Sequence, residues 1–167
     1  MLKIVCDADG LIKSNKAGIL ELLADESQLF VGPEVIREAV SDGKASGYPD
    51  AIEIERLSGK FQQPGKPESN LNPEYLEIAA YLGKGEREVL GLYLAFQADR
   101  ILSDDQEFLT LLIALNISFL TPASAILLLL EKGRLGKGEA LNALERIQPY
   151  IEPGLFRASV QSIHEYF

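Results

Sequence analysis

The sequence has few of the residue types on which several common architectures and mechanisms depend. It contains one cysteine, Cys6, so a disulfide framework is excluded. We therefore expect a cytoplasmic protein in which Cys6 is a small core residue. The one histidine, His164, lies near the end of the chain, far in sequence from the acidic residues considered below. This position disfavours catalytic triads and histidine metal ligands.

Positive charge and long apolar runs are also scarce. The sequence has 16 Lys and Arg residues and 25 Asp and Glu residues, which gives a formal net charge of -9. This balance argues against a broad basic surface for nucleic acid, unless bound divalent cations supply the positive charge locally. The most apolar window, 117–130, is interrupted by Thr121-Pro122 and is too short to span a bilayer. The chain begins without a basic and apolar leader, so we expect neither a signal peptide nor a membrane segment.

Strand and helix patterns alternate along the chain. At 167 residues and 47% hydrophobic content, one sizeable core is expected, with a domain over 1–130 and a helical C-terminal extension over 131–167 packed on it. This order predicts an α/β fold with a central, mainly parallel sheet. Short apolar runs predict strands at 2–6, 28–31, 101–102 and 117–120. Helices are predicted at 17–24, 33–40, 50–57, 73–82, 86–96, from 108, at 122–130, from 138 to about 149, and at 155–167, with connecting segments within 41–72.

Acidic residues follow the predicted strands. Asp7 and Asp9 come directly after the first strand, Asp105 follows the third, and Glu38 lies on the helix after the second. The carboxyl ends of parallel strands meet at one edge of a sheet, so these acids are expected to share a pocket. The alternative for a lone Asp at such a place is that it caps the next helix.

A further acid lies at the start of the predicted helix 86–96. Glu86 falls on the apolar face that Val89, Leu90 and Tyr93 define, whereas Glu88 sits at its edge. A carboxylate on a buried face is costly unless it is paired, which favours Glu86 as a functional residue. We interpret Glu88 as an ordinary first-turn partner of the helix dipole.

Four segments, taken in order, resemble the PIN-domain ribonucleases, a family that includes the toxin subunits of many prokaryotic toxin-antitoxin pairs. They are Ile4–Ile12 around Asp7, Pro33–Glu38, Gly85–Leu90, and Ser103–Phe108 around Asp105. The resemblance implies a PIN-like three-layer α/β/α sandwich. It also implies catalytic and metal-binding roles for the residues matching the family's acids, namely Asp7, Glu38, Glu86 and Asp105. Because Glu88-Val-Leu also matches a form of the third motif, the choice between Glu86 and Glu88 stays open, and Asp9, Glu88, Ser103 and Asp104 are secondary candidates.

The resemblance implies hydrolysis of RNA with Mg²⁺ or Mn²⁺ as cofactor. The metal would lower the pKa of a bound water, and the products would carry 5′-phosphate and 3′-hydroxyl ends. Ser103 would orient Asp105 or a phosphate. Lys13 and Arg37 would contact the RNA backbone, or else serve only as solvated surface charges. The partners implied are RNA, a small antitoxin protein that inserts a basic side chain among the acids, and a second copy of the chain in a homodimer.

Two other functions stay open at this point. Asp7-Ala8-Asp9-Gly10 also resembles the first motif of haloacid-dehalogenase-type phosphatases, with Asp7 as nucleophile and Asp9 as general acid. In that interpretation Ser103, Asp104 and Asp105 provide the metal-binding segment, but Glu38 and Glu86 have no role. The second alternative is a non-catalytic PIN-like scaffold that only binds RNA or protein.

Overall fold

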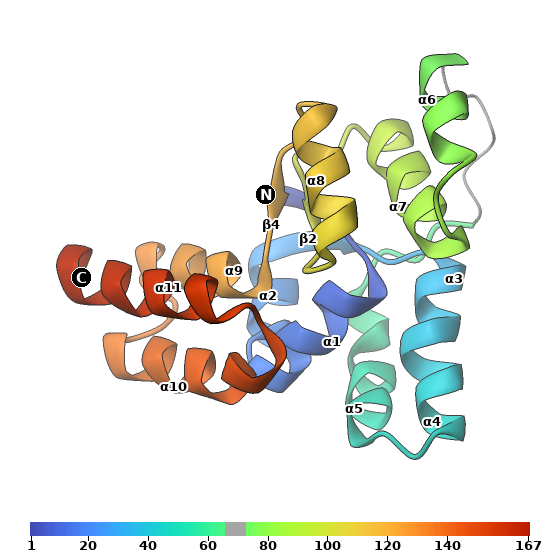
Figure 1. Cartoon of the computed structure of the whole chain (residues 1–167). Helices are drawn as coiled ribbons and strands as arrows, with labels where there is room; N and C mark the ends of the chain where they lie inside the picture. The colour runs from blue at the N-terminus through green and yellow to red at the C-terminus, as the bar shows by residue number, and fades with distance from the viewer. Residues whose placement is uncertain (66–72) are drawn as a thin grey trace.

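A sheet of four parallel strands forms the centre of the described part of the molecule (Figure 1). The computed structural model describes residues 1–65 and 73–167. The strands are β1 (Leu2–Cys6), β2 (Ser27–Phe30), β3 (Arg100–Leu102) and β4 (Phe119–Leu120), in the spatial order β2-β1-β3-β4. In the register, Val5 of β1 pairs with Phe30 on one side and with Ile101 on the other. The predicted α/β fold with a parallel sheet is thus confirmed.

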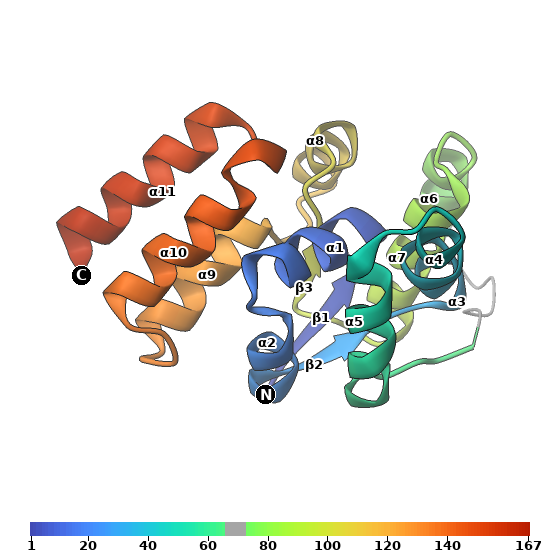
Figure 2. The ribbon, with the colours of Figure 1, turned by 90° about the horizontal axis from the view of Figure 1, so that it is seen from below.

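Helices cover both faces of this sheet. Helix α7 (Lys84–Ala95) packs against β1 and β3 on one face, while α1 (Ala8–Ala17) lies on the other (Figure 2). Helix α2 (Leu20–Glu26) follows α1, and α8 (Gln106–Ala114) connects β3 to β4. The predicted three-layer α/β/α arrangement is confirmed. Because all four strands run in the same direction, their carboxyl ends share one edge.

A long continuous helix lies beside this edge (Figure 1). It consists of α3 (Pro33–Ile36), the π-helical turn η1 (Arg37–Asp42) and α4 (Gly43–Ala45), and Pro33 occupies the first turn, as the sequence predicted. Helix α5 (Pro49–Leu57) packs back against η1 and α1 and ends in the 3-10 turn η2 (Ser58–Lys60). Helix α6 (Pro73–Ala79) then precedes α7. The part of the predicted connecting stretch at 66–72 lies outside the described residues.

The C-terminal segment is helical. Helices α9 (Pro122–Glu131), α10 (Lys137–Ile147) and α11 (Pro153–Tyr166) pack on one another, with the 3-10 turn η3 (Gln148–Tyr150) between the last two (Figure 1). Helix α10 also packs on α1, and its buried residues Ala140, Leu144 and Ile147 join the same apolar core as β1. Within the described residues, no helix combines the length and apolar character that crossing a bilayer requires.

One prediction about the elements was wrong. The sequence predicted a single helix over 17–24, whereas α1 begins at Ala8 and α2 begins at Leu20. Gly18, with φ of 76°, ends α1 and separates the two helices. The start of α1 was missed because Asp9 and Gly10 have low helix propensity, but Asp7 caps this first turn and Gly10 packs it against the sheet.

Candidate active site

A cavity of about 320 Å³ lies at the carboxyl edge of the sheet. Four of the acids that line it come from separate parts of the chain: the end of β1, the π-helical turn η1, the first turn of α7, and the end of β3. These acids are the predicted residues Asp7, Glu38, Glu86 and Asp105. Asp9 lines the cavity as well, together with Arg37 and Lys84. The structure therefore brings the four principal candidates to one pocket, although nearly 100 residues separate the first from the last.

The position of Asp7 is fixed by the junction of β1, α1 and β3. Its backbone N–H donates to Leu102 O at 3.0 Å, which continues the parallel pairing one residue past β1. Its Oδ1 accepts from Gly10 N at 2.6 Å and caps α1. A Cβ at position 10 would lie 2.5 Å from Leu102 O, so only glycine lets α1 start this close to β3. The capping alternative for Asp7 is therefore correct as local structure, and it orients the carboxylate at the pocket.

Ser103 joins the two aspartates of neighbouring strands. Its fully buried hydroxyl lies in hydrogen-bond contact with the Asp7 carboxylate and accepts from Asp105 N at 3.2 Å. Asp105 Oδ1 in turn accepts from Phe108 N at 2.8 Å and caps α8, while the residue stays exposed. Ser103 thus contacts both Asp7 and Asp105, and its orienting role stays a prediction.

Burial raises the pKa of Asp7 to about 7. The hydrogen bonds from Ser103 and Gly10 oppose this rise, while the negative charges of Asp9 and Asp105 add to it. Desolvation disfavours the charged form of a carboxyl group, and neighbouring carboxylates disfavour it further. The raised pKa of Asp7 therefore comes mainly from its burial, with a smaller part from the neighbouring acids.

Glu38 reaches the pocket from the π-helical turn η1. A π-helical turn displaces side chains from the regular α-helical positions, and such turns are frequent at functional sites. Glu38 Oε2 would lie 3.6 Å from a Cβ on Gly85, so its carboxylate approaches the start of α7 next to Glu86. Partial burial raises the pKa of Glu38, with nearby carboxylates adding to the rise and Arg37 opposing it.

The two glutamates of α7 differ from the prediction in their burial. Glu88, only 7% exposed, is the buried one, whereas Glu86 is partly exposed and its Oε2 accepts from Gly83 N at 2.9 Å at the start of its own helix. The prediction of a buried Glu86 was wrong. Helix α7 packs against α3 as well as against the sheet, which buries Glu88, whereas Glu86 in the first turn faces the pocket. Glu86 still lines the acidic pocket.

Glu88 caps a different helix from the one that carries it. Its Oε2 accepts from Glu34 N at 3.0 Å and from Val35 N at 3.2 Å, in the first turn of α3. A Cβ on Gly32 would lie 2.2 Å from Glu88 Oε2, so the backbone before α3 approaches this carboxylate closely. Glu88 was therefore correctly interpreted as a partner of the first turn of a helix, but that helix is α3 and not its own helix α7. The contact fixes α3, and with it the turn η1 that carries Glu38.

Lys13 is an internal counter-ion. Its Nζ lies 2.7 Å from Asp104 Oδ2 and 2.8 Å from Asp9 Oδ2, and its side chain is only 15% exposed. Desolvation opposes its charge, but Asp104 and Asp9 outweigh this and raise the pKa of Lys13. The predicted contact of Lys13 with RNA is disfavoured, because the ammonium is held between two carboxylates and its side chain is largely buried. Asp104 is the buried member of this group. Burial raises the pKa of Asp104, and the positive charge of Lys13 opposes the rise.

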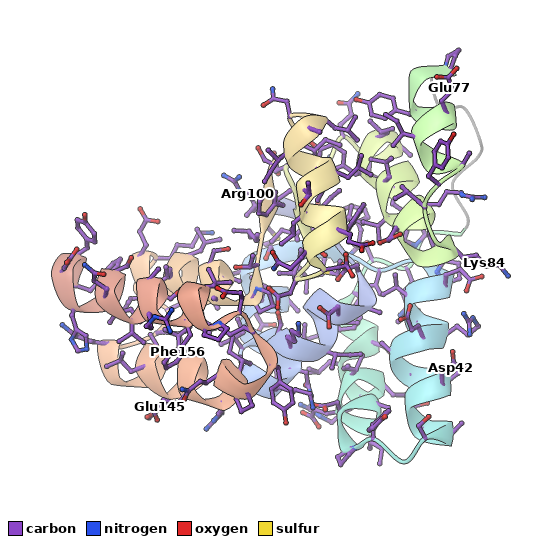
Figure 3. The ribbon with its side chains drawn as sticks, viewed as in Figure 1. Asp42, Glu77, Lys84, Arg100, Glu145 and Phe156 are labelled. Carbon is purple, nitrogen blue, oxygen red and sulfur yellow. The ribbon has the colours of Figure 1, made fainter. Side chains whose placement is uncertain are left out.

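Two basic side chains remain at the rim of the pocket. Arg37 is 55% exposed and pairs with Glu34 at 2.8 Å and with Asp42 at 2.5 Å. Lys84 makes no ion pair with another residue of the described ranges, and it points outward from the start of α7 beside α3 (Figure 3). Sequence reasoning missed Lys84, although its place between Gly83 and Gly85 at a predicted helix start was a usable signal. His164 is exposed on α11 and does not line the pocket.

The donor set of this pocket suits a hard divalent cation. Carboxylate oxygens are the ligands that Mg²⁺ and Mn²⁺ prefer, and acids from four separate elements line this pocket. As their side chains stand, no three His, Cys, Asp or Glu residues in the described ranges form a ready-made metal-binding group. Glu38 and Glu86 have long side chains, which could rotate toward an ion at the pocket. We conclude that the residues fit the metal by their chemistry.

Comparison with known proteins identifies a family for the chain. A family model described as a PIN domain matches residues 3–165, which is nearly the whole chain. No curated protein shows a significant match. The match extends over β1 to β4 and includes the C-terminal helices α10 and α11.

Proposed function

Because the chain belongs to the PIN-domain family and has its nuclease-type fold, we propose that it is a metal-dependent endoribonuclease. The observation that carries the proposal is the convergence of Asp7, Glu38, Glu86 and Asp105, from four separate elements, on one pocket at the carboxyl edge of the sheet. Ligands of open α/β sheets bind at this edge. The reaction is hydrolysis of RNA phosphodiester bonds within the strand.

Asp7 and Asp105 are the principal ligands for Mg²⁺ or Mn²⁺ in this proposal, with Glu38 and Glu86 completing the shell directly or through water. When bound, the ion supplies an activated water and stabilises the negative charge that develops on the phosphate. Ser103 and Gly10 hold Asp7 in place, and Phe108 N holds Asp105. These contacts fix both carboxylates before substrate arrives, which lowers the cost of organising the site.

Arg37 and Lys84 are the residues proposed to position the RNA. Both lie at the pocket, and both present cationic groups to a backbone phosphate. Asp9 and Asp104, in contrast, are occupied by Lys13 and stay outside the metal shell. The chain's net charge of -9 makes the bound metal the main source of attraction for RNA.

The two alternatives gain less support. A phosphatase of the haloacid-dehalogenase type requires Asp9 as a general acid, but Asp9 is paired with Lys13, and the family match is to a PIN domain. A non-catalytic scaffold is consistent with the fold but leaves the convergence of four acids without a role. Activity therefore decides between the ribonuclease and the scaffold.

A toxin role follows from the same family resemblance. We include in the proposal an antitoxin protein that covers the acidic pocket and a homodimer of this chain in the cytoplasm. The exposed apolar side chains Tyr81 and Ile113, at 92% and 66% exposure, supply surface for such a dimer contact. Gene neighbourhood tests the first partner, and the mass measured by light scattering tests the second.

The direct test of function is cleavage of labelled RNA. Wild-type protein is incubated with a mixture of structured and single-stranded RNAs in Mn²⁺, in Mg²⁺ and in EDTA, beside Asp7→Asn and Asp105→Asn. The matched control is Asp25→Asn, which removes a half-exposed carboxylate on α2 away from the pocket. We expect internal cleavage by wild type and the control in either metal, with none in EDTA or in the two pocket variants. Folded wild-type protein that cuts no RNA in either metal would contradict the proposal, and hydrolysis of p-nitrophenyl phosphate instead would favour the phosphatase.

A further inference from the structure

A second cavity, of about 410 Å³, adjoins the acidic pocket and shares Glu38 with it. Its walls come from α1, from the helical segment η1–α4, from the start of α5 and from η3. Two partly exposed aromatic side chains line it, Tyr48 at 63% and Tyr150 at 50% exposure. Neither tyrosine contributes to the acidic site described above.

The ring of Tyr150 contacts the end of a chain of polar side chains. Lys16 Nζ lies 4.8 Å from the centroid of the Tyr150 ring. Lys16 forms an ion pair with Asp50, and Asp50 also accepts from Asn15 Nδ2 at 2.9 Å. Because α1 and α5 fix Lys16 and Asp50, the ring has a defined cationic neighbour before any ligand binds. Such preorganised aromatic rings are efficient stacking surfaces, because little side-chain entropy is lost on binding.

The charges of this cavity disfavour a phosphate. Glu38, Asp42 and Asp50 line it, and its one lysine, Lys16, is neutralised by Asp50. A planar, uncharged group suits it better, since tyrosine rings and apolar residues such as Ile12 and Ala39 offer contact without repulsion. The volume falls in the range of pockets that accept small organic groups.

We propose that this cavity binds the nucleobase next to the cleaved phosphate, with Tyr48 and Tyr150 as the aromatic contacts. The inference rests on the proposed ribonuclease function. A strand whose phosphate lies in the acidic pocket passes Glu38 and Arg37 at the border of the two cavities. Arg37, paired with Asp42 of the second cavity, then stands between the phosphate and the base. Base stacking on aromatic rings is the usual way in which proteins hold single-stranded RNA.

Binding of short single-stranded RNA, measured by fluorescence anisotropy, tests this proposal. Ca²⁺ replaces Mn²⁺ so that binding is read without cleavage. The probes are adenosine, cytidine and uridine oligomers and an abasic ribose-phosphate chain of the same length. The variants are Tyr48→Ala, Tyr150→Ala and the two Phe substitutions, with Tyr166→Ala as control because Tyr166 is 76% exposed and lines neither cavity.

We expect each Ala variant to weaken binding of the base-bearing oligomers by about fivefold or more. Binding of the abasic chain should not change, and the Phe variants and Tyr166→Ala should bind like wild type. Equal loss for abasic and base-bearing chains, or no loss for either, overturns the proposal, as does wild-type protein that binds none of the oligomers.

The same variants in Mn²⁺ separate this proposal from the proposed function. Cleavage by wild type together with unaffected Tyr variants refutes the nucleobase cavity alone. Base-dependent binding through the two tyrosines without any cleavage by wild type refutes the nuclease activity but supports the cavity.

Discussion

Asp7 combines structural and functional demands in a single carboxyl group. One oxygen caps α1 through Gly10 N, and burial beside other acids raises its pKa to about 7. In an unfolded chain the same group titrates near its ordinary value of about 4. The folded protein therefore binds this proton more tightly than the unfolded chain does.

The pKa of Asp7 predicts a pH-dependent cost in the metal-free protein. Its contribution to stability is present below about pH 4 and is lost as pH rises through 7, because the buried group must then ionise. We expect Asp7→Asn to unfold roughly 5 °C higher than wild type at about pH 8 in EDTA, with little difference at about pH 4. Thermal unfolding by circular dichroism measures this. A Tm difference that is the same at both pH values would contradict the prediction.

Lys13 gives a second prediction for a single residue. Removing its ammonium leaves Asp104 buried without a counter-ion, so Lys13→Met should lower the free energy of unfolding by about 2–4 kcal/mol. Lys44→Met is the matched control, because the Lys44–Glu55 pair is exposed and should contribute less than about 0.5 kcal/mol. Urea unfolding compares the two. Similar losses for both lysines would mean that Lys13 is no internal counter-ion.

At the scale of elements, the contact between α7 and α3 organises the acidic pocket. Glu88 on α7 satisfies two backbone N–H groups in the first turn of α3, and α3 continues into the π-helical turn that carries Glu38. Gly32 permits the close approach. The two glutamates of α7 therefore have different roles, although they are only two residues apart.

Matched substitutions of the two glutamates test this division. Glu88→Ala leaves the N–H groups of Glu34 and Val35 without their acceptor and should cost about 1–3 kcal/mol of unfolding free energy, whereas Glu88→Gln retains an acceptor oxygen and should cost less. Glu86→Gln should weaken Mn²⁺ binding while leaving the unfolding free energy almost unchanged. Calorimetry for metal binding and urea unfolding give the two quantities. The reverse pattern, with Glu88→Gln abolishing Mn²⁺ binding in a fully stable protein, would make Glu88 the third ligand.

The elements also show what the sequence was able to predict. Local patterns located the parallel strands, the helix after Pro33 and the acids at the strand ends, because burial and capping leave clear traces over a few residues. They missed α1, whose start depends on the fit of Gly10 against Leu102 O in a strand more than 90 residues away. The burial of Glu88 and the pairing of Lys13 with Asp104 are likewise long-range contacts. A pattern over a few neighbouring residues cannot predict contacts of this kind.

At the scale of the whole molecule, charge governs how RNA can bind. The net charge is -9. The two lysines of α1, Lys13 and Lys16, are both paired with aspartates of the protein. Arg37 and Lys84 alone are a small basic surface for a polyanion. Divalent cations held by the pocket are therefore expected to supply most of the attraction.

This balance predicts that RNA binding depends on divalent ions specifically and not on ionic strength alone. At constant ionic strength, adding Ca²⁺ should tighten binding of a single-stranded oligomer by about tenfold or more, whereas exchanging it for Na⁺ should not. The double variant Asp7→Asn, Asp105→Asn should lose this response to Ca²⁺, and Asp25→Asn should keep it. Anisotropy in EDTA equal to that in Ca²⁺ would show that RNA binds without the acidic pocket.

The proposed function depends on one cation site formed by the four acids of the pocket. Titration of Mn²⁺ followed by electron paramagnetic resonance tests it directly, because the signal of free Mn²⁺ falls as the ion binds. We expect saturable binding to wild type and to Asp25→Asn, weaker binding to Glu38→Gln and Glu86→Gln, and none to the double variant Asp7→Asn, Asp105→Asn. Mn²⁺ binding that persists in this folded double variant, or that is absent from wild type, would show that the four acids do not form a cation site.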